Sequence, residues 1–177
     1  MLSFTYSNEL LLGATNMRVC FVVGLVCGAT VNSAAIELGA VIPPYPEGTE
    51  VRHGVCISDA SGYSHNCDYA VEVLESVDGT PLSILVLRSL KKNAQEAPKW
   101  QVTDVVDYPD VLSDHFFVMT TCRIGGKYND KILAVVKSGN AKWWQATSWA
   151  GVVDISTGKF NKLSPADIEC ENEGWGL

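Results

Sequence analysis

The chain has 177 residues and a net charge of −7, from 13 basic and 20 acidic side chains. A surface with this charge repels polyphosphate backbones and anionic lipids, and the longest basic run is only Lys91-Lys92. The composition therefore argues against nucleic acid as a partner.

Residues 17–35 predict a secretory signal peptide. A basic residue, Arg18, precedes an apolar run over residues 19–29, and the small residues Ser33 and Ala35 fit a signal-peptidase cleavage site. The apolar run is shorter than the roughly 20 residues of a stable transmembrane helix. We therefore expect no stable membrane span, and we expect the mature protein to be periplasmic or secreted.

The segment before this leader, residues 1–16, carries Glu9 and no basic residue. A leader normally begins with positive charge, so translation is expected to start at Met17; the alternative is a long, atypical leader. Cleavage after Ala35 leaves about 140 residues, the length of one domain.

Four of the six cysteines lie after residue 35: Cys56, Cys67, Cys122 and Cys170. An even number of cysteines in an exported chain indicates disulfides, and four cysteines allow three pairings. We favour Cys56–Cys67, which flanks a turn-rich loop, together with Cys122–Cys170, which would tie the C-terminal tail to a central strand. Each rival pairing would have to cross the core, which makes it harder to reach but leaves it open.

Residues 36–50 are rich in proline and predict an extended, loosely packed lead-in to a single β domain over residues 51–177. Apolar residues then recur with period 2 between turn signals. A short helix over residues 67–76 is the alternative to a strand there. The expected strands cover residues 69–77, 82–90, 100–108, 116–124, 132–136, 143–155 and 160–163.

Several details refine this β pattern. Residues 132–136 are apolar at both parities, which predicts a central strand covered on both faces. Gly151 indicates a bulge or bend, residues 154–158 a tight turn, and residues 164–167 one helical turn. The predicted fold class is mostly β: a single antiparallel meander sheet, curled into a barrel or sandwich and stabilised by disulfides.

Three groups of residues invite a chemical interpretation, and each has a simpler one. His53, Cys56, His65 and Cys67 could bind zinc, but their spacing is irregular and a disulfide competes for the thiols. Ser113-Asp114-His115 holds the residue types of a hydrolase triad, but neighbouring strand residues point to opposite faces. We expect a turn at Ser113-Asp114 instead.

The third group is an acidic run that could hydrolyse glycosides or bind calcium, although a solvated turn fits it better. Its members are Asp104, Asp107, Asp110 and Asp114. No catalytic residue, metal ligand or cofactor is therefore assigned.

Tryptophans are the candidate binding residues. Trp143 and Trp144 are adjacent, so a strand places them on opposite faces, one in the core and one available to a partner or a sugar. The alternative is that loops cover both. Trp175 ends an acidic, glycine-rich tail, and it either packs onto the sheet beside Cys170 or faces a partner.

The last 80 or so residues resemble the end of a class of small exported proteins of Gram-negative bacteria that has no assigned function. The shared pattern is a tryptophan, then D-x-x-T-G-x-F, then a cysteine close to a terminal E-G-[WY]-G. The resemblance implies export and the Cys122–Cys170 pairing, and it implies no catalytic residues. The matching residues are Trp144, Asp154, Thr157, Gly158, Phe160, Cys170, Glu173, Gly174, Trp175 and Gly176.

These observations favour a non-enzymatic binding or inhibitory module of the cell envelope, whose ligand is an unidentified envelope or extracellular protein or glycan. The alternative is a hydrolase of an envelope polymer, with Asp and His residues that converge only in the fold. Carboxylates in a pocket would favour the enzyme, and an exposed aromatic patch would favour the binding module.

Overall fold

A computed structural model describes residues 36–57, 67–90 and 98–176 of the chain. The predicted upstream extension and signal peptide, residues 1–35, lie outside these ranges. Residues 33–177 form one compact unit. Within the described ranges, no helix is both long enough and apolar enough to cross a membrane.

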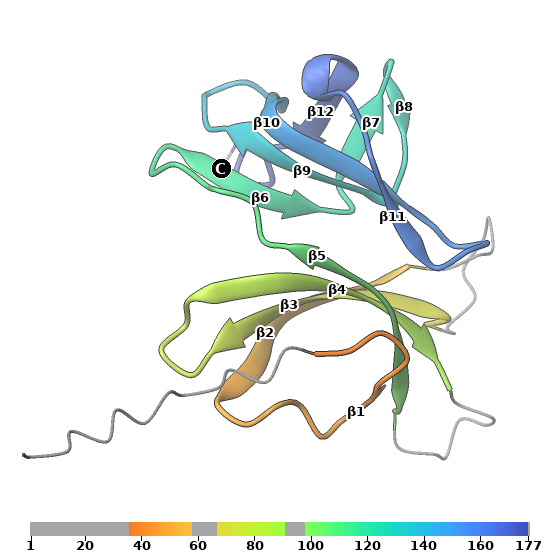
Figure 1. Ribbon diagram of the computed structural model, residues 1–177. Coiled ribbons are helices and arrows are strands. Elements are labelled where there is room, and N and C mark those ends of the chain that lie inside the picture. The colour runs from red at the N-terminus through yellow and green to blue at the C-terminus, as the bar shows by residue number, and fades with distance from the viewer. Residues whose placement is uncertain (1–35, 58–66, 91–97, 177) are drawn as a thin grey trace, which may run out of the picture. The chain divides into compact units, whose positions relative to one another are not determined.

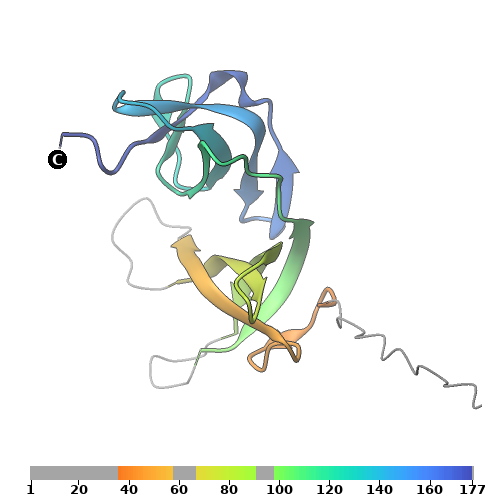
Figure 2. The same ribbon diagram turned by 90° about the vertical axis from the view of Figure 1, so that its left-hand side faces the viewer.

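The strands divide between two antiparallel sheets (Figure 1). The first has the order β1-β5-β4-β3-β2, in which β2 to β5 form a meander curled into a half-barrel (Figure 2). This confirms the predicted mostly β class. The strands of this sheet are β1 (Val41–Ile42), β2 (Thr49–Ile57), β3 (Tyr69–Ser76), β4 (Pro81–Ser89) and β5 (Trp100–Asp107).

The second sheet has the order β6-β9-β10-β12-β7-β8, and β11 pairs with β10 beside this path. A single 3₁₀ turn, η1 (Pro165–Asp167), confirms the helical turn expected before β12. The strands are β6 (His115–Met119), β7 (Cys122–Ile124), β8 (Lys127–Tyr128), β9 (Ile132–Lys137), β10 (Trp143–Asp154), β11 (Lys159–Lys162) and β12 (Ile168–Glu171).

The central strand β9 is buried on both faces, as its apolar sequence predicts. Ile132, Ala134 and Val136 pack inside the second sheet against the Cys122–Cys170 pair. Leu133 points the other way and packs with Ile84 and other residues of the first sheet. The alternation of side chains therefore lets one strand serve two hydrophobic clusters.

Three polar contacts join the first sheet to β11. Asp104 lies next to a register shift in the β4–β5 pairing, and its Oδ2 accepts a hydrogen bond from the Phe160 N–H at 2.8 Å. Lys159 Nζ donates to the Thr103 carbonyl at 2.6 Å. Lys159 Nζ also pairs with Asp104 Oδ1 at 3.5 Å. We call these three contacts the β5–β11 clasp. It fixes the return strand that follows the turn at residues 154–158.

One alternative for a segment is excluded, and one expected strand is corrected. The short helix considered for residues 67–76 does not form, because β3 pairs on both sides, with β2 and β4. The strand expected over residues 116–124 is interrupted at Thr120, which has a φ of +69°. There the chain leaves β9 and joins β12, so the segment forms two strands, β6 and β7.

The proline-rich lead-in is more firmly held than the sequence predicts. The Gly39 N–H donates to the Val102 carbonyl at 2.8 Å, and the Val102 N–H donates to the Ala40 carbonyl at 2.9 Å. Ile42 in β1 is only 2 % exposed. The lead-in is bound because the outer edge of β5 needs hydrogen-bond partners.

Both favoured disulfides form. Cys56–Cys67 closes the loop between β2 and β3, with a Cα–Cα distance of 5.2 Å. Cys122–Cys170 joins directly opposed residues of β7 and β12 at 3.9 Å, and both cysteines are fully buried. Such bonds are typical of an oxidising compartment outside the cytoplasm.

Candidate binding groove

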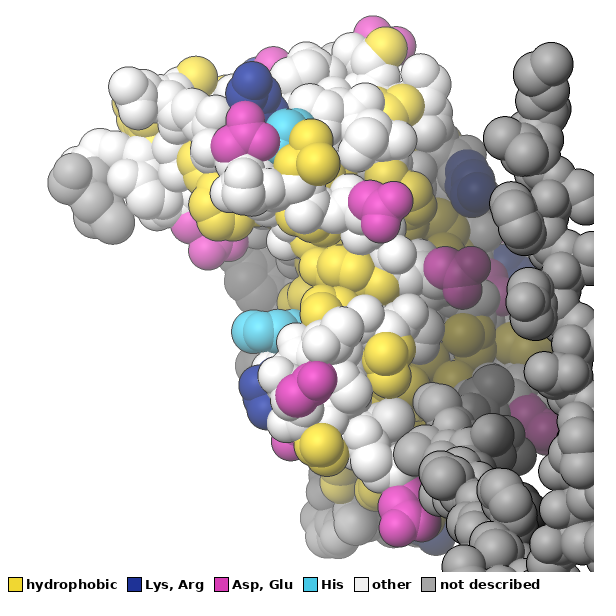
Figure 3. Space-filling model, turned by 60° about the vertical axis from the view of Figure 1, so that its left-hand side comes forward, with side chains coloured by type: hydrophobic (Ala, Val, Ile, Leu, Met, Phe, Trp, Pro, Cys, Tyr) yellow, Lys and Arg dark blue, Asp and Glu magenta, His cyan; other side chains and the backbone are white. Residues whose placement is uncertain are grey.

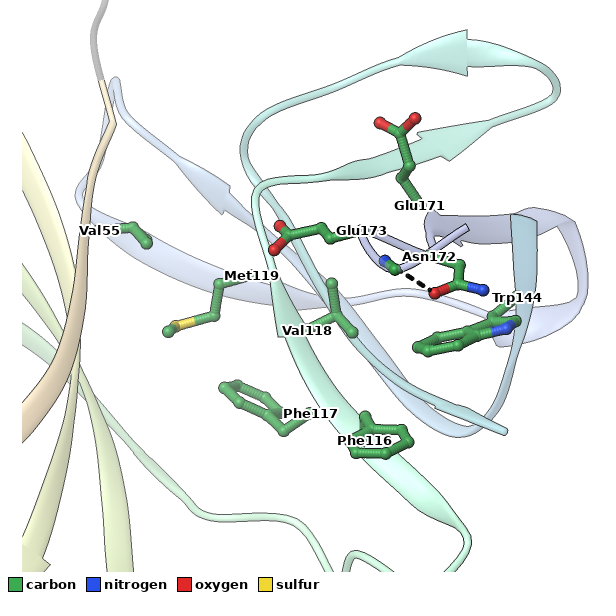
Figure 4. A pocket seen from close by; sticks show the side chains of 10 residues that line it. Val55, Phe116, Phe117, Val118, Met119, Trp144, Glu171, Asn172 and Glu173 are labelled. Carbon is green, nitrogen blue, oxygen red and sulfur yellow. Dashed lines mark hydrogen bonds between the residues drawn. The ribbon is translucent and has the colours of Figure 1, made fainter. Parts of the chain in front are cut away.

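A hollow of about 300 Å³ lies along β6, and we call it the β6 groove. Residues 116–119 of β6 form one wall, and Val55 of β2 and Trp144 of β10 contribute to the lining (Figure 4). The C-terminal tail, residues 171–174, completes it. On the face that Figure 3 shows, hydrophobic side chains form a band with acidic side chains on both sides of it.

The position of the groove follows from strand geometry. Successive side chains of a strand point to opposite faces. Four consecutive β6 residues nevertheless border the same hollow. The hollow must therefore run along the edge of β6, where side chains of both faces and the backbone are all within reach.

An aromatic pair forms part of the groove lining. Phe116 is 50 % exposed and stacks on Trp144, with 5.5 Å between ring centroids. The indole N–H of Trp144 donates to the Gly139 carbonyl at 2.7 Å, and its ring packs against the core of the second sheet. The hydrogen bond and the core packing thus fix the position of Trp144, and Phe116 stacks on its ring at the surface.

The tail forms an acidic rim. The Asn172 N–H donates to the Lys142 carbonyl at 2.8 Å, and Asn172 Oδ1 accepts from the Gly174 N–H at 3.1 Å. This turn places Glu171 and Glu173 on the groove. Glu171 pairs with Lys142 Nζ at 3.7 Å, whereas Glu173 is exposed and makes no ion pair with another described residue.

A second cavity, of about 240 Å³, shares Phe117 and Met119 with the β6 groove. Glu75 lines it and is only 4 % exposed. The Glu75 carboxylate lies 3.9 Å from His53 Nε2 and 3.9 Å from Arg52 Nε. Burial raises the pKa of the Tyr108 phenol in this cavity, and the nearby charge of Glu75 raises it further.

The chemistry available in this second cavity is limited. Glycoside hydrolysis usually needs two carboxyl groups on either side of the bond. Among the described residues that line the cavity, Glu75 is the one carboxylate, and none carries a serine or cysteine nucleophile. The His53–Glu75–Arg52 group therefore resembles a partly buried ion-pair cluster.

The three tryptophans proposed as binding residues separate in the fold. Trp144 lines the β6 groove. Trp143 lies on the opposite face of β10, under the guanidinium of Arg123 at 3.8 Å from the ring centroid. Trp175 is 54 % exposed, and Lys142 Nζ lies 5.7 Å from its ring, so it does not pack into the core edge.

In the segment Ser113-Asp114-His115, two neighbouring side chains meet, which the alternation of a strand did not predict. Asp114 Oδ1 contacts His115 Nδ1 at 2.6 Å, because Asp114 lies in the turn before β6 and not on the strand itself. This hydrogen bond holds the pKa of Asp114 below its usual range. Among the described contacts, no hydrogen bond joins the Ser113 hydroxyl to Asp114 or His115. Ser113 and Asp114 form the expected turn.

The other candidate groups do not assemble into sites. Asp104 belongs to the β5–β11 clasp, and Asp114 pairs with His115, so the acidic run is dispersed. The Cys56–Cys67 bond consumes both thiols of the zinc set, and His65 lies outside the described residues. Within the described ranges, no three His, Cys, Asp or Glu residues are grouped as metal ligands would be.

Sequence reasoning missed the residues of β6 itself. In the segment HFFVM, apolar residues occupy both odd-numbered and even-numbered positions, as they do in β9. This pattern is visible in the sequence. In β9 such a pattern accompanies pairing on both sides, whereas β6 is an edge strand. Apolar residues at both parities of an edge strand indicate a surface that something else covers.

No family model, no curated protein and no solved structure matches the chain. The resemblance to exported Gram-negative proteins stays a prediction. Three of the residues that carry it, Trp144, Glu173 and Gly174, line the β6 groove.

Proposed function

We propose that the protein is an exported, non-enzymatic binding or inhibitory module of the cell envelope, and that it binds its partner in the β6 groove. One observation carries this proposal: an apolar hollow runs along the edge of a strand that has no second neighbour among the described residues. A stacked Phe116–Trp144 pair beside it offers the exposed aromatic surface that binding sites favour. The partner is an envelope or extracellular protein or glycan.

The proposal places the mature protein in the periplasm or outside the cell. Two disulfides support an oxidising compartment, and the predicted leader supports export. Intact-mass measurement of the protein recovered from these fractions tests this. We expect a chain without residues 1–35; a mass that retains residues 18–35 would contradict it.

Binding through the groove can be tested by capture from an envelope extract on the immobilised, exported protein. Phe116→Asp places a charge on the aromatic wall and should abolish retention. Val77→Asp, at an exposed turn outside the groove, is the control and should retain the same species as the wild type. Equal retention by all three proteins would refute a binding site at β6.

The alternative function is a hydrolase of an envelope polymer, and the buried Glu75 beside His53 is the observation that favours it. Release of soluble fragments from purified peptidoglycan is the discriminating assay. A hydrolase releases fragments and loses this activity in Glu75→Gln. A binding module releases none, and Glu75→Gln leaves its retention of envelope species intact.

A further inference from the structure

We propose that the β6 groove binds an extended polypeptide segment of a partner protein, and that this segment adds to the free edge of β6 as a further strand. The inference rests on the proposed binding function and names the class of its partner. It depends on three features of the groove: its backbone groups, its position and its charge.

The backbone of β6 has hydrogen-bonding groups directed away from its sheet. Thr120 N–H donates to the Ile132 carbonyl at 3.1 Å, at one end of the β6–β9 ladder. In an antiparallel ladder such contacts recur at every second residue, so the even-numbered residues bond β9. The N–H and C=O groups of Phe117 and Met119 therefore point outward, and no described strand lies on that side.

These outward groups select a polypeptide. They repeat every second residue, about 6.6 Å apart along a strand. A second extended backbone presents complementary N–H and C=O groups at the same interval, which is the basis of recognition by strand addition. A glycan could stack on Phe116, but it has no such repeat to match Phe117 and Met119.

The hollow provides room for the side chains of the added strand. It follows the edge of β6, bordered by Phe116 and Val118 from one face and by Phe117 and Met119 from the other. Alternate side chains of a paired segment would then lie beside Trp144 and beside Met119. Val55, from the edge strand β2, closes the opposite side (Figure 4).

The charge of the rim defines the segment further. Glu173 is exposed without an ionic partner among the described residues, and Glu171 has only a long contact to Lys142. The whole chain also carries a net charge of −7. A segment with alternating apolar residues and at least one Lys or Arg complements this site.

The test starts with a displayed library of random linear peptides, selected on the exported protein. We expect the selected peptides to alternate apolar residues and to contain Lys or Arg. Synthetic copies should shift the backbone amide signals of Phe117 and Met119 in spectra of isotope-labelled protein. Peptides methylated on alternate backbone nitrogens should bind in one methylation register and fail in the other, which tests strand pairing without altering the protein.

Two substitutions at one position isolate the backbone contribution. Met119→Pro and Met119→Ala both remove the side chain, but only proline removes the outward N–H, and edge strands tolerate proline at such positions. Loss of one backbone hydrogen bond should make binding to the proline variant roughly tenfold weaker than to the alanine variant. Glu173→Gln should weaken a basic peptide about twofold at low salt only.

Three results would overturn the inference. The first is equal affinity of the Pro and Ala variants, and the second is binding of peptides in both methylation registers. The third is failure to select any peptide while the wild type still retains an envelope species that Phe116→Asp loses. That third result leaves the binding function intact and points to a glycan, whereas retention by Phe116→Asp removes the function itself.

Discussion

At the scale of single residues, Glu72 shows how burial alters a carboxyl group. The Tyr45 hydroxyl donates to Glu72 Oε2 at 2.9 Å. Burial raises the pKa of Glu72 above its usual 4.5, and the hydrogen bond from Tyr45 only partly opposes this rise. Burial raises the pKa of Tyr45 as well, so the phenol stays protonated and remains the donor.

We predict that Glu72→Gln stabilises the protein at pH 8 and changes little at pH 4. The native state binds the Glu72 proton more tightly than the unfolded state does, so this contribution to stability is present at low pH and is lost as pH rises through the raised pKa. Glutamine keeps an oxygen for Tyr45 without the charge. Thermal melts of both proteins at pH 4, 6 and 8 measure the effect, with exposed Glu47→Gln as control. A variant less stable than wild type at pH 8 would contradict the prediction.

Gly151 has a different role from the bulge that the sequence predicts. The register of β10 against β9 shifts earlier, between Ala146 and Ala150. Gly151 itself lies beneath the Phe160 ring, which would overlap a Cβ atom at this position. The same ring stacks on Trp149, with 5.0 Å between centroids. The glycine is needed because an aromatic ring occupies the space of its missing side chain.

We predict that Gly151→Ala lowers the free energy of unfolding by about 1–3 kcal/mol, as overpacking of a core usually does. Gly139→Ala is the matched control, because the nearest atom to its added Cβ is 3.9 Å away. Urea denaturation compares the three proteins. In a Phe160→Leu background the cost of Gly151→Ala should shrink. An unchanged cost there would show that the Phe160 ring is not its cause.

At the scale of elements, the sequence predicts which strand residues are buried better than it predicts which strands pair. The apolar patterns of β6 and β9 are alike, and both have side chains in the clusters of the core. Their positions differ because neighbours in a sheet are chosen by contacts far apart in the chain, such as β12 with β7. Alternation within one segment carries no information about such partners. The apolar pattern of β6 is visible in its sequence, but its edge position, which turns that pattern into the wall of a groove, could not be inferred from its own residues.

The C-terminal tail shows the same limit. Pairing of its first residues with the Cys122 strand is confirmed, with the Glu171 N–H donating to the Thr121 carbonyl at 2.8 Å. Cys122 is fully buried, although the interruption at Thr120 separates it from β6 and leaves Phe116 and Ile124 exposed. Of the two options for Trp175, packing onto the sheet beside Cys170 is wrong: the side chain is 54 % exposed, because the Asn172 turn directs the chain along the groove rim.

We therefore predict that backbone pairing, and not Trp175, accounts for the stabilising effect of the tail. Deletion of residues 171–177 removes the hydrogen bonds of Glu171 and Asn172 and should lower the melting temperature by several degrees, equivalent to about 1–2 kcal/mol. Trp175→Ala should change the free energy of unfolding by about 0.5 kcal/mol or less, as at other exposed positions. Calorimetry distinguishes the two. A similar loss in both proteins would mean that the tryptophan packs onto the sheet after all.

At the scale of the whole molecule, the β5–β11 clasp explains residues that the sequence places in two unrelated patterns. In the sequence, Asp104 belongs to an acidic run, and residues 154–158 belong to the C-terminal pattern that carries the resemblance. The turn is as predicted, since Asp154 Oδ1 accepts from the Ser156 N–H at 2.9 Å and Gly158 has a φ of +68°. Its contact with β5 was not foreseeable, because no periodicity connects segments about 55 residues apart.

The last prediction concerns this clasp. Asp104→Ala leaves the Phe160 N–H without its acceptor and removes the Asp104–Lys159 ion pair at 3.5 Å. A donor that loses its partner in a half-buried position costs about 1–3 kcal/mol, so the free energy of unfolding should fall by that amount. Asp107→Ala, at the exposed end of the same strand, is the control and should stay within about 0.5 kcal/mol of wild type.

Hydrogen exchange then locates the effect. The Phe160 amide should exchange faster in Asp104→Ala, whereas the amides of β3 and β4 should keep their order of protection, because these strands retain both neighbours. Unchanged protection at Phe160 would mean that the Asp104 bond does not hold β11. Equal destabilisation by Asp104→Ala and Asp107→Ala would instead attribute the loss to charge. With the expected result, Asp104 is a structural link between the sheets, which leaves the β6 groove and the Glu75 cavity as the places to look for function.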